Sequence, residues 1–139
     1  MKKIDISWEK DGFLLRPARR EDAGQYYAQN FCPLDKELIR MTGSKESFTR
    51  EEVVGFFLQC IKAEDRYDFL LVAEDGRIAG ESVINEIDWE GRSGNFRIAI
   101  FQQKDRGKGL GSWMVQATRD FAFGELKLHR LGLNVFSFN

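Results

Sequence analysis

Three glycines stand at alternate positions just before a strongly helical pattern, and this run limits how the chain can fold. The run is Arg106-Gly107-Lys108-Gly109-Leu110-Gly111-Ser112. The apolar residues that follow at helical spacing are Leu110, Met114, Ala117 and Phe121. A glycine inside a helix costs about 1 kcal/mol, but it lets a ligand approach the backbone closely. Because a helix N-terminus offers free N–H groups and a favourable dipole to anions, the run predicts a phosphate or pyrophosphate cradle.

The spacing of the glycines argues against the two commonest nucleotide-binding loops. A Walker loop requires four residues between its first glycine and a Gly-Lys-Ser/Thr triplet, which this run does not have. A dinucleotide-binding fingerprint requires glycine where Ser112 stands, and an acidic residue after the next strand, where the chain has Asn134. A glycine-rich turn that merely opens a helix remains the plain alternative.

The remaining pattern predicts a single α/β (α+β) domain with the element order β-α-α-β-β-β-α-β. Strands are expected at residues 13–16, 68–74, 77–87, 95–101 and 129–138, and helices at residues 21–29, 50–64 and 110–123. Asp75-Gly76 is a hairpin signal, and Thr49 with Glu52 forms a capping-box pattern at the start of the second helix. We therefore expect an antiparallel meander, followed by a helical crossover to the last strand.

Composition excludes several classes of protein. The 139 residues carry a formal net charge of −1, so no overall basic field favours a nucleic-acid partner. The 2 cysteines have no metal-ligand spacing, and the single histidine cannot build a metal site. No apolar run approaches membrane-spanning length, and we expect a cytoplasmic protein with no metal and no membrane partner.

The glycine run resembles motif A of the GNAT superfamily of N-acetyltransferases, usually written Gln/Arg-x-x-Gly-x-Gly/Ala. The opening residues 14–23, the triplet Ile98-Ala99-Ile100 and the segment Leu128-His129-Arg130-Leu131 resemble neighbouring parts of the same fold. The similarity covers essentially the whole chain and is closest to the branch that acts on ribosomal-protein N-termini and polyamines. It implies a GNAT-like acyl-CoA N-acyltransferase fold, with a mixed, mostly antiparallel sheet flanked by helices.

The resemblance implies acetyl-CoA as the co-substrate, and it assigns residues to that molecule. In the family, the strand before motif A pairs with the pantetheine amides, and the motif holds the pyrophosphate. A polar residue near the last strand often adds a contact. Carried onto this chain, the cofactor residues are Ile98, Ala99, Ile100, Arg106, Gly107, Lys108, Gly109, Leu110, Gly111, Ser112, Asn134 and Asn139. The side chains of Arg106 and Lys108 are either phosphate contacts or solvated cations.

The catalytic groups of the family are matched less completely. The related branch often carries a glutamate where this chain has Asn95, which cannot act as a base. Glu81 and Glu86 are the candidate substitutes, although either could be an ordinary surface carboxylate. The tyrosine that serves as general acid has no counterpart among the tyrosines of this chain. We therefore expect a C-terminally truncated form of the fold, whose open last strand associates as a homodimer or strand-exchanged oligomer.

Three functions remain open from the sequence. The first is transfer of an acetyl group from acetyl-CoA to a primary amine of a small molecule or of a protein N-terminus. The second is a catalytically impaired module that binds acetyl-CoA and has a regulatory role. The third is a purely structural interaction domain. Acidic residues expected on the acceptor side favour a cationic amine, and they are Asp35, Glu37, Glu86, Asp88 and Glu90.

Overall fold

The computed structural model describes residues 6–30 and 49–135. Within them, six strands form one sheet in the order β1-β2-β3-β4-β5-β6. The strands are β1 (Trp8–Lys10), β2 (Phe13–Pro17), β3 (Tyr67–Val72), β4 (Ile78–Asp88), β5 (Ser93–Ile100) and β6 (Arg130–Val135). All neighbouring pairs are antiparallel except β5 and β6, which are parallel. The α/β fold and the crossover predicted from the sequence are confirmed.

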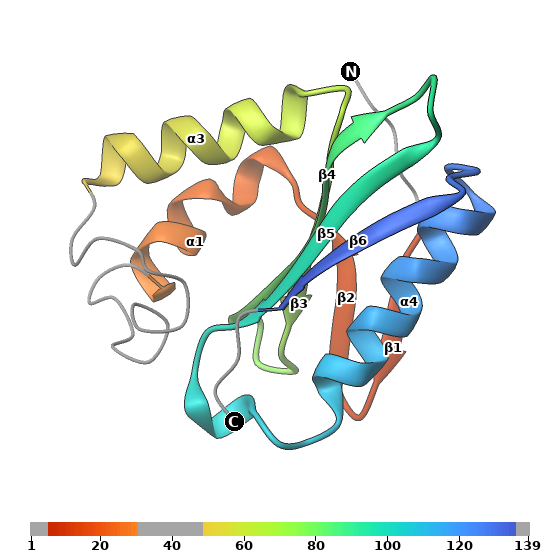
Figure 1. Ribbon diagram of the computed structural model, residues 1–139. Coiled ribbons are helices and arrows are strands. Elements are labelled where there is room, and N and C mark those ends of the chain that lie inside the picture. The colour runs from red at the N-terminus through yellow and green to blue at the C-terminus, as the bar shows by residue number, and fades with distance from the viewer. Residues whose placement is uncertain (1–5, 31–48, 136–139) are drawn as a thin grey trace.

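Three α-helices and two short 3₁₀ helices belong to the described part of the chain. They are η1 (Arg20–Asp22), α1 (Ala23–Asn30), α3 (Arg50–Lys62), η2 (Gln103–Asp105) and α4 (Leu110–Gly124). Helices α1 and α3 lie on one face of the sheet and α4 on the other (Figure 1). Each is too short or too polar to cross a bilayer. Asp35, Glu37 and Asn139 lie outside the described residues, and Asn134 lies in β6, opposite Arg97 of β5.

The boundaries differ from the sequence expectation at a few places, for local reasons. Strand β1 was not predicted, because three residues carry almost no periodicity, and it exists through its pairing of Trp8 with Leu15. The first α-helix begins at Ala23 rather than Glu21, since Asp22 accepts the Arg19 N–H at 2.8 Å and closes a 3₁₀ turn there. The capping box of α3 is confirmed, with Glu52 donating its N–H to the Thr49 hydroxyl at 3.1 Å.

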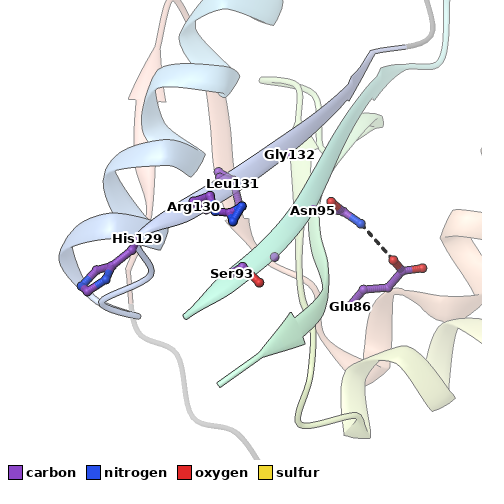
Figure 2. Close-up of a pocket in the computed structure, with 8 residues that line it drawn as sticks. Glu86, Ser93, Asn95, His129, Arg130, Leu131 and Gly132 are labelled. Atoms are coloured by element: carbon purple, nitrogen blue, oxygen red, sulfur yellow. Dashed lines mark hydrogen bonds between the residues drawn. The ribbon is translucent and has the colours of Figure 1, made fainter. Parts of the chain in front are cut away.

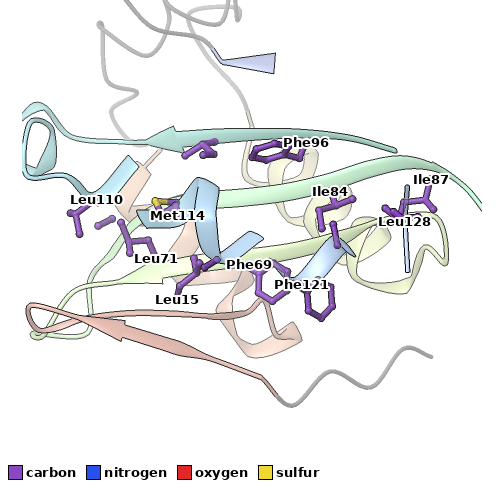
Figure 3. Close-up of a cluster of buried hydrophobic side chains, with 14 residues drawn as sticks. Leu15, Phe69, Leu71, Ile84, Ile87, Phe96, Leu110, Met114, Phe121 and Leu128 are labelled. Atoms are coloured by element: carbon purple, nitrogen blue, oxygen red, sulfur yellow. The ribbon is translucent and has the colours of Figure 1, made fainter. Parts of the chain in front are cut away.

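The sheet separates two apolar clusters, one on each face. The cluster beneath α4 contains Phe69, Leu71, Met114 and Phe121 among its buried members (Figure 3). The neighbouring residue Leu70 points the other way, toward the cluster under α1 and α3. This alternation along β3 follows the two-residue period of a strand. It assigns every residue of the central strands to one face, which fixes where candidate site residues lie.

Candidate active site

At the end of β5, the backbone groups of alternate residues face away from β4. Phe101 donates its N–H to the Ala79 carbonyl at 2.9 Å, across the β4–β5 pair. Because successive residues of a strand point their N–H and C=O groups to opposite sides, those of Ile98 and Ile100 face the side of β6. The β5–β6 ladder reaches Ile98 opposite Val135. The Ile100 N–H therefore lies beyond the last pair of that ladder, while the N–H and C=O of Ala99 face β4.

Arg106 ties the glycine loop to this strand end. Its guanidinium donates two hydrogen bonds to the Ile100 carbonyl, from Nε at 2.9 Å and from Nη2 at 2.7 Å. The sequence suggested a phosphate contact or a solvated cation for this side chain. Its position instead fixes the distance between the end of β5 and the start of the glycine loop.

A buried ion pair supports the loop from the other side. Asp105, only 2% exposed, accepts two hydrogen bonds from the Arg77 guanidinium at 2.7 and 3.1 Å. The hydrogen bond with Asp105 raises the pKa of Arg77, although burial offsets part of the increase. The sequence offered no signal for this pair, because Arg77 is 28 positions away in the β3–β4 hairpin.

The space next to the glycines of the loop is unoccupied by other protein atoms. Gly107 and Gly109 have φ values of +79° and +77°, a conformation that residues with side chains seldom adopt. Gly109 is the N-cap of α4 and supplies no side-chain cap. The first backbone bond of the helix runs from the Trp113 N–H to the Gly109 carbonyl at 3.2 Å. An ideal Cβ on Gly107, Gly109 or Gly111 would meet no atom within 4 Å.

This geometry suits an anion. The N–H groups of Leu110, Gly111 and Ser112 belong to the first helical turn, where no intrahelical acceptor exists. No acidic residue stands in that turn, and the helix dipole adds positive potential. Lys108 is part of the loop, and its Nζ lies 5.8 Å from the centroid of the Phe13 ring. The open space next to these donors is where the sequence predicted a pyrophosphate.

Glu81 lies in the middle of the sheet, directly opposite Ala99 of β5. Only 8% of the residue is exposed. The Tyr26 hydroxyl of α1 donates a hydrogen bond to its Oε2 at 3.1 Å, and Arg97 Nη2 lies 4.0 Å from its Oε1. Burial raises the pKa of the Glu81 carboxyl, and the positive charge of Arg97 offsets part of that increase. A raised pKa makes a carboxylate a better proton acceptor, so Glu81 could accept a proton beside the end of β5.

The other candidate carboxylate, Glu86, is not brought together with Glu81. It lies five positions further along β4, roughly 16 Å away at the rise of a strand. Glu86 is exposed, has a φ of +51° and accepts a hydrogen bond from Asn95 Nδ2 at 2.9 Å. It lines a pocket at the first residues of β5 and β6 (Figure 2). Sequence reasoning named both carboxylates, but it could not foresee that one is buried under α1 and the other exposed.

Tyr26 lies near the end of β5, with its ring centroid 5.8 Å from that of Phe101. Burial raises the pKa of the Tyr26 hydroxyl well above its usual value, and the negative charge of Glu81 adds to the increase. Tyr67 packs its ring against Phe121 and Trp89, with centroid distances of 5.5 and 6.4 Å. The residues described hold no group of three or more His, Cys, Asp or Glu side chains that could ligate a metal.

The chain is similar to known acetyltransferases in sequence. The family model of the acetyltransferase (GNAT) domain matches residues 13–139. An SPbeta prophage-derived uncharacterized N-acetyltransferase, YokL of Bacillus subtilis (strain 168), is 27% identical over 134 residues, which cover 95% of this chain and 71% of the relative.

Solved structures share the fold at low sequence identity. Ribosomal-protein-S5-alanine acetyltransferase from Vibrio fischeri has a TM-score of 0.75 and 23% identity, with 91% of this chain and 72% of that chain covered. Spermidine N-acetyltransferase from Vibrio cholerae, solved with CoA and spermine, has a TM-score of 0.72 and 21% identity, covering 89% of this chain and 71% of that one. On the family match over nearly its whole length, the chain belongs to the GNAT acetyltransferase domain family.

Proposed function

We propose that this protein transfers the acetyl group of acetyl-CoA to a primary amine of a small molecule or of a protein N-terminus. One observation carries the proposal: a helix start without a side-chain cap, opened by glycines with φ values of +79° and +77°, is tied by Arg106 to the end of β5, where the β5–β6 ladder has ended. A phosphate-bearing thioester needs both features, an anion site and a strand edge. The GNAT family match supports acetyl transfer to amines in general.

The proposed cofactor site uses the chain's backbone more than its side chains. The amides of residues 107–112 would hold the pyrophosphate, and the backbone of β5 beyond Ile98, its last residue paired with β6, would face the thioester end of the pantetheine arm. Ala99 would make no backbone hydrogen bond to the cofactor, since its N–H and C=O face β4. Asn134 and Asn139 remain candidates for polar contacts with the arm. When bound, acetyl-CoA supplies a thioester whose C–S bond breaks as the acceptor nitrogen bonds to the acetyl carbon.

Glu81 is our candidate for the general base. An amine is protonated at neutral pH and must lose a proton before its nitrogen can attack. The Glu81 carboxylate, opposite Ala99 and with a raised pKa, could take that proton directly or through water. The Ile100 N–H, on the open side of β5, is the candidate donor to the thioester oxygen.

Two observations support a second candidate function. Asn95 donates its amide to Glu86 and cannot act as a base. Tyr26, with a strongly raised pKa and a hydrogen bond to Glu81, is poorly suited to give a proton to a leaving thiolate. These features favour the alternative of an acetyl-CoA-binding module with impaired turnover. Amine-dependent release of the thiol distinguishes the enzyme from the module.

Binding of acetyl-CoA is tested by two matched glycine substitutions. Gly111 and Gly55 both lie in helices with nothing within 4 Å of an added Cβ, so Gly111→Ala and Gly55→Ala should each stabilise the fold slightly, by about 0.5 kcal/mol. The methyl group at Gly111 would occupy the proposed pyrophosphate space. We expect calorimetry to show affinity for acetyl-CoA reduced about tenfold or more in Gly111→Ala only. Equal affinities in the two variants would refute the assigned anion site.

A further inference from the structure

Tyr26 of α1 contacts the proposed general base directly. Its hydroxyl donates a hydrogen bond to Glu81 Oε2 at 3.1 Å, and this contact is buried. The Tyr26 ring packs against Phe57 of α3 and against Phe101, which follows β5, with centroid distances of 4.8 and 5.8 Å. Because neighbours from α3 and from the end of β5 fix the ring, the hydroxyl holds the carboxylate at a defined place.

The other carboxylate oxygen of Glu81, Oε1, lies beside β5. Its neighbour there is Arg97, whose Nη2 is 4.0 Å away, which is too far for a hydrogen bond. Glu81 is paired with Ala99, one residue before Ile100, whose N–H is the candidate donor to the thioester oxygen. Since the Tyr26 hydroxyl occupies Oε2, Oε1 is the oxygen better placed to take a proton next to the end of β5.

The charged and titratable groups around Glu81 come from each element packed against it. Burial raises the pKa of the Cys60 thiol to about 11, and it raises the pKa of the Tyr26 hydroxyl well above its usual value. Both groups therefore keep their protons near neutral pH, and Tyr26 acts as a donor only. The groups that surround Glu81 are Tyr26 of α1, Cys60 of α3, Asp68 of β3, Arg66 just before β3, and Arg97 of β5.

We propose that Tyr26 is a positioning residue for acetyl transfer, which holds Glu81 so that its Oε1 takes the proton of the acceptor ammonium group. The inference rests on the proposed function, with Glu81 as the base. The proton moves from nitrogen to Oε1, the nitrogen electron pair bonds to the acetyl carbon, and the electrons of the C–S bond leave with the CoA sulfur. Tyr26 keeps its own proton throughout.

The same contact affects how easily Glu81 ionises. Burial raises the pKa of the Glu81 carboxyl, whereas the hydrogen bond from Tyr26 lowers it. A hydrogen bond donated to a carboxylate favours the charged form, which is the form that a base requires. Removal of the hydroxyl should therefore raise the pKa of Glu81 further, and a residue that only filled space would not have this effect.

The test removes the hydroxyl and keeps the ring. Tyr26→Phe is compared with the unmodified chain and with Tyr67→Phe, whose tyrosine packs on the opposite face of the sheet. Thiol release from acetyl-CoA with primary amines gives kcat/KM as a function of pH, and each amine titrates identically with all three proteins. NMR titration of the Glu81 carboxyl, identified by its absence in Glu81→Gln, measures the pKa of that group without turnover.

We expect Tyr26→Phe to move both the acidic limb of kcat/KM and the measured pKa of Glu81 upward by about one pH unit, while Tyr67→Phe moves neither. Turnover with an unmoved acidic limb would overturn the inference and leave the proposed function standing. An unchanged pKa of Glu81 overturns the inference, whatever the turnover. A raised pKa with no thiol release, even from the unmodified chain, supports the contact and refutes the proposed function.

A double variant separates positioning from a purely structural role. Tyr26→Phe combined with Glu81→Gln has no buried carboxylate that could lose its donor. Its kcat/KM should therefore match that of Glu81→Gln alone within about twofold. A further loss in the double variant would assign Tyr26 a structural role and overturn the inference. If Tyr26→Phe alone does not fold, the double variant should still fold, and failure of both to fold would likewise overturn it.

Discussion

At the scale of single residues, Glu81 is a buried carboxyl whose pKa is raised. Burial raises the pKa of its carboxyl, so the folded chain binds this proton more tightly than the unfolded chain does. Between the usual carboxyl pKa and the raised value, the folded state therefore holds more protons, and stability falls as pH rises through that window. A buried carboxylate that destabilises the fold is what a general base in a dry site requires.

The substitution Glu81→Gln separates these two effects. We expect it to raise the melting temperature at pH values above the raised pKa of Glu81, with a gain that shrinks as the pH falls through that pKa. We expect kcat/KM to fall about 100-fold if Glu81 takes the proton from the acceptor. Thermal unfolding at several pH values and a thiol-release assay measure the two quantities. Glu125→Gln, at the exposed C-cap of α4, is the control. A gain that is absent or equal at all pH values would contradict the argument.

Side-chain roles were the least predictable part of the sequence. The glycine spacing identified the loop, and the positive φ values of Gly107 and Gly109 have the physical origin expected for glycine. The partner of Arg106 could not be predicted, because its contact with the Ile100 carbonyl depends on how tightly the loop turns back. The same holds for Tyr26, which reaches Glu81 across 55 positions of sequence.

At the scale of elements, the periodicity of apolar residues predicted the longer strands and the helices, whereas it did not predict the three-residue elements. The hairpin at Asp75-Gly76, with Gly76 at a φ of +89°, formed where the sequence signal placed it. The elements β1 and η2 are three residues each, too short to show a period, and tertiary contacts determine them. For η2 that contact is the ion pair between Asp105 and Arg77.

The ion pair gives a prediction for the whole loop. Asp105→Ala would leave the Arg77 guanidinium partly buried without its bidentate partner, so we expect a loss of about 3–5 kcal/mol in the free energy of unfolding. Asp75→Asn, at an exposed side chain 4.0 Å from the same arginine, should change it by less than about 1 kcal/mol. Urea denaturation measures both. Similar small losses in the two variants would show that the pair does not anchor η2.

At the scale of the molecule, β6 is the edge strand of the described sheet, next to β5 alone. An edge strand offers backbone groups to a further strand. We propose that two copies associate through this edge, as a homodimer or by strand exchange. Sedimentation at micromolar concentration should then detect a species heavier than the 16.1 kDa chain. A single species at the mass of one chain, across the concentration range, would contradict this arrangement.

We propose that the end of β5 and the start of α4 together support acetyl transfer to an amine. The most direct test measures thiol release from acetyl-CoA with a panel of primary amines, for the unmodified chain, Gly111→Ala and Gly55→Ala. We predict amine-dependent release that Gly55→Ala retains and Gly111→Ala loses at limiting acetyl-CoA. Binding of acetyl-CoA without release for any amine would contradict the claim and favour the binding module.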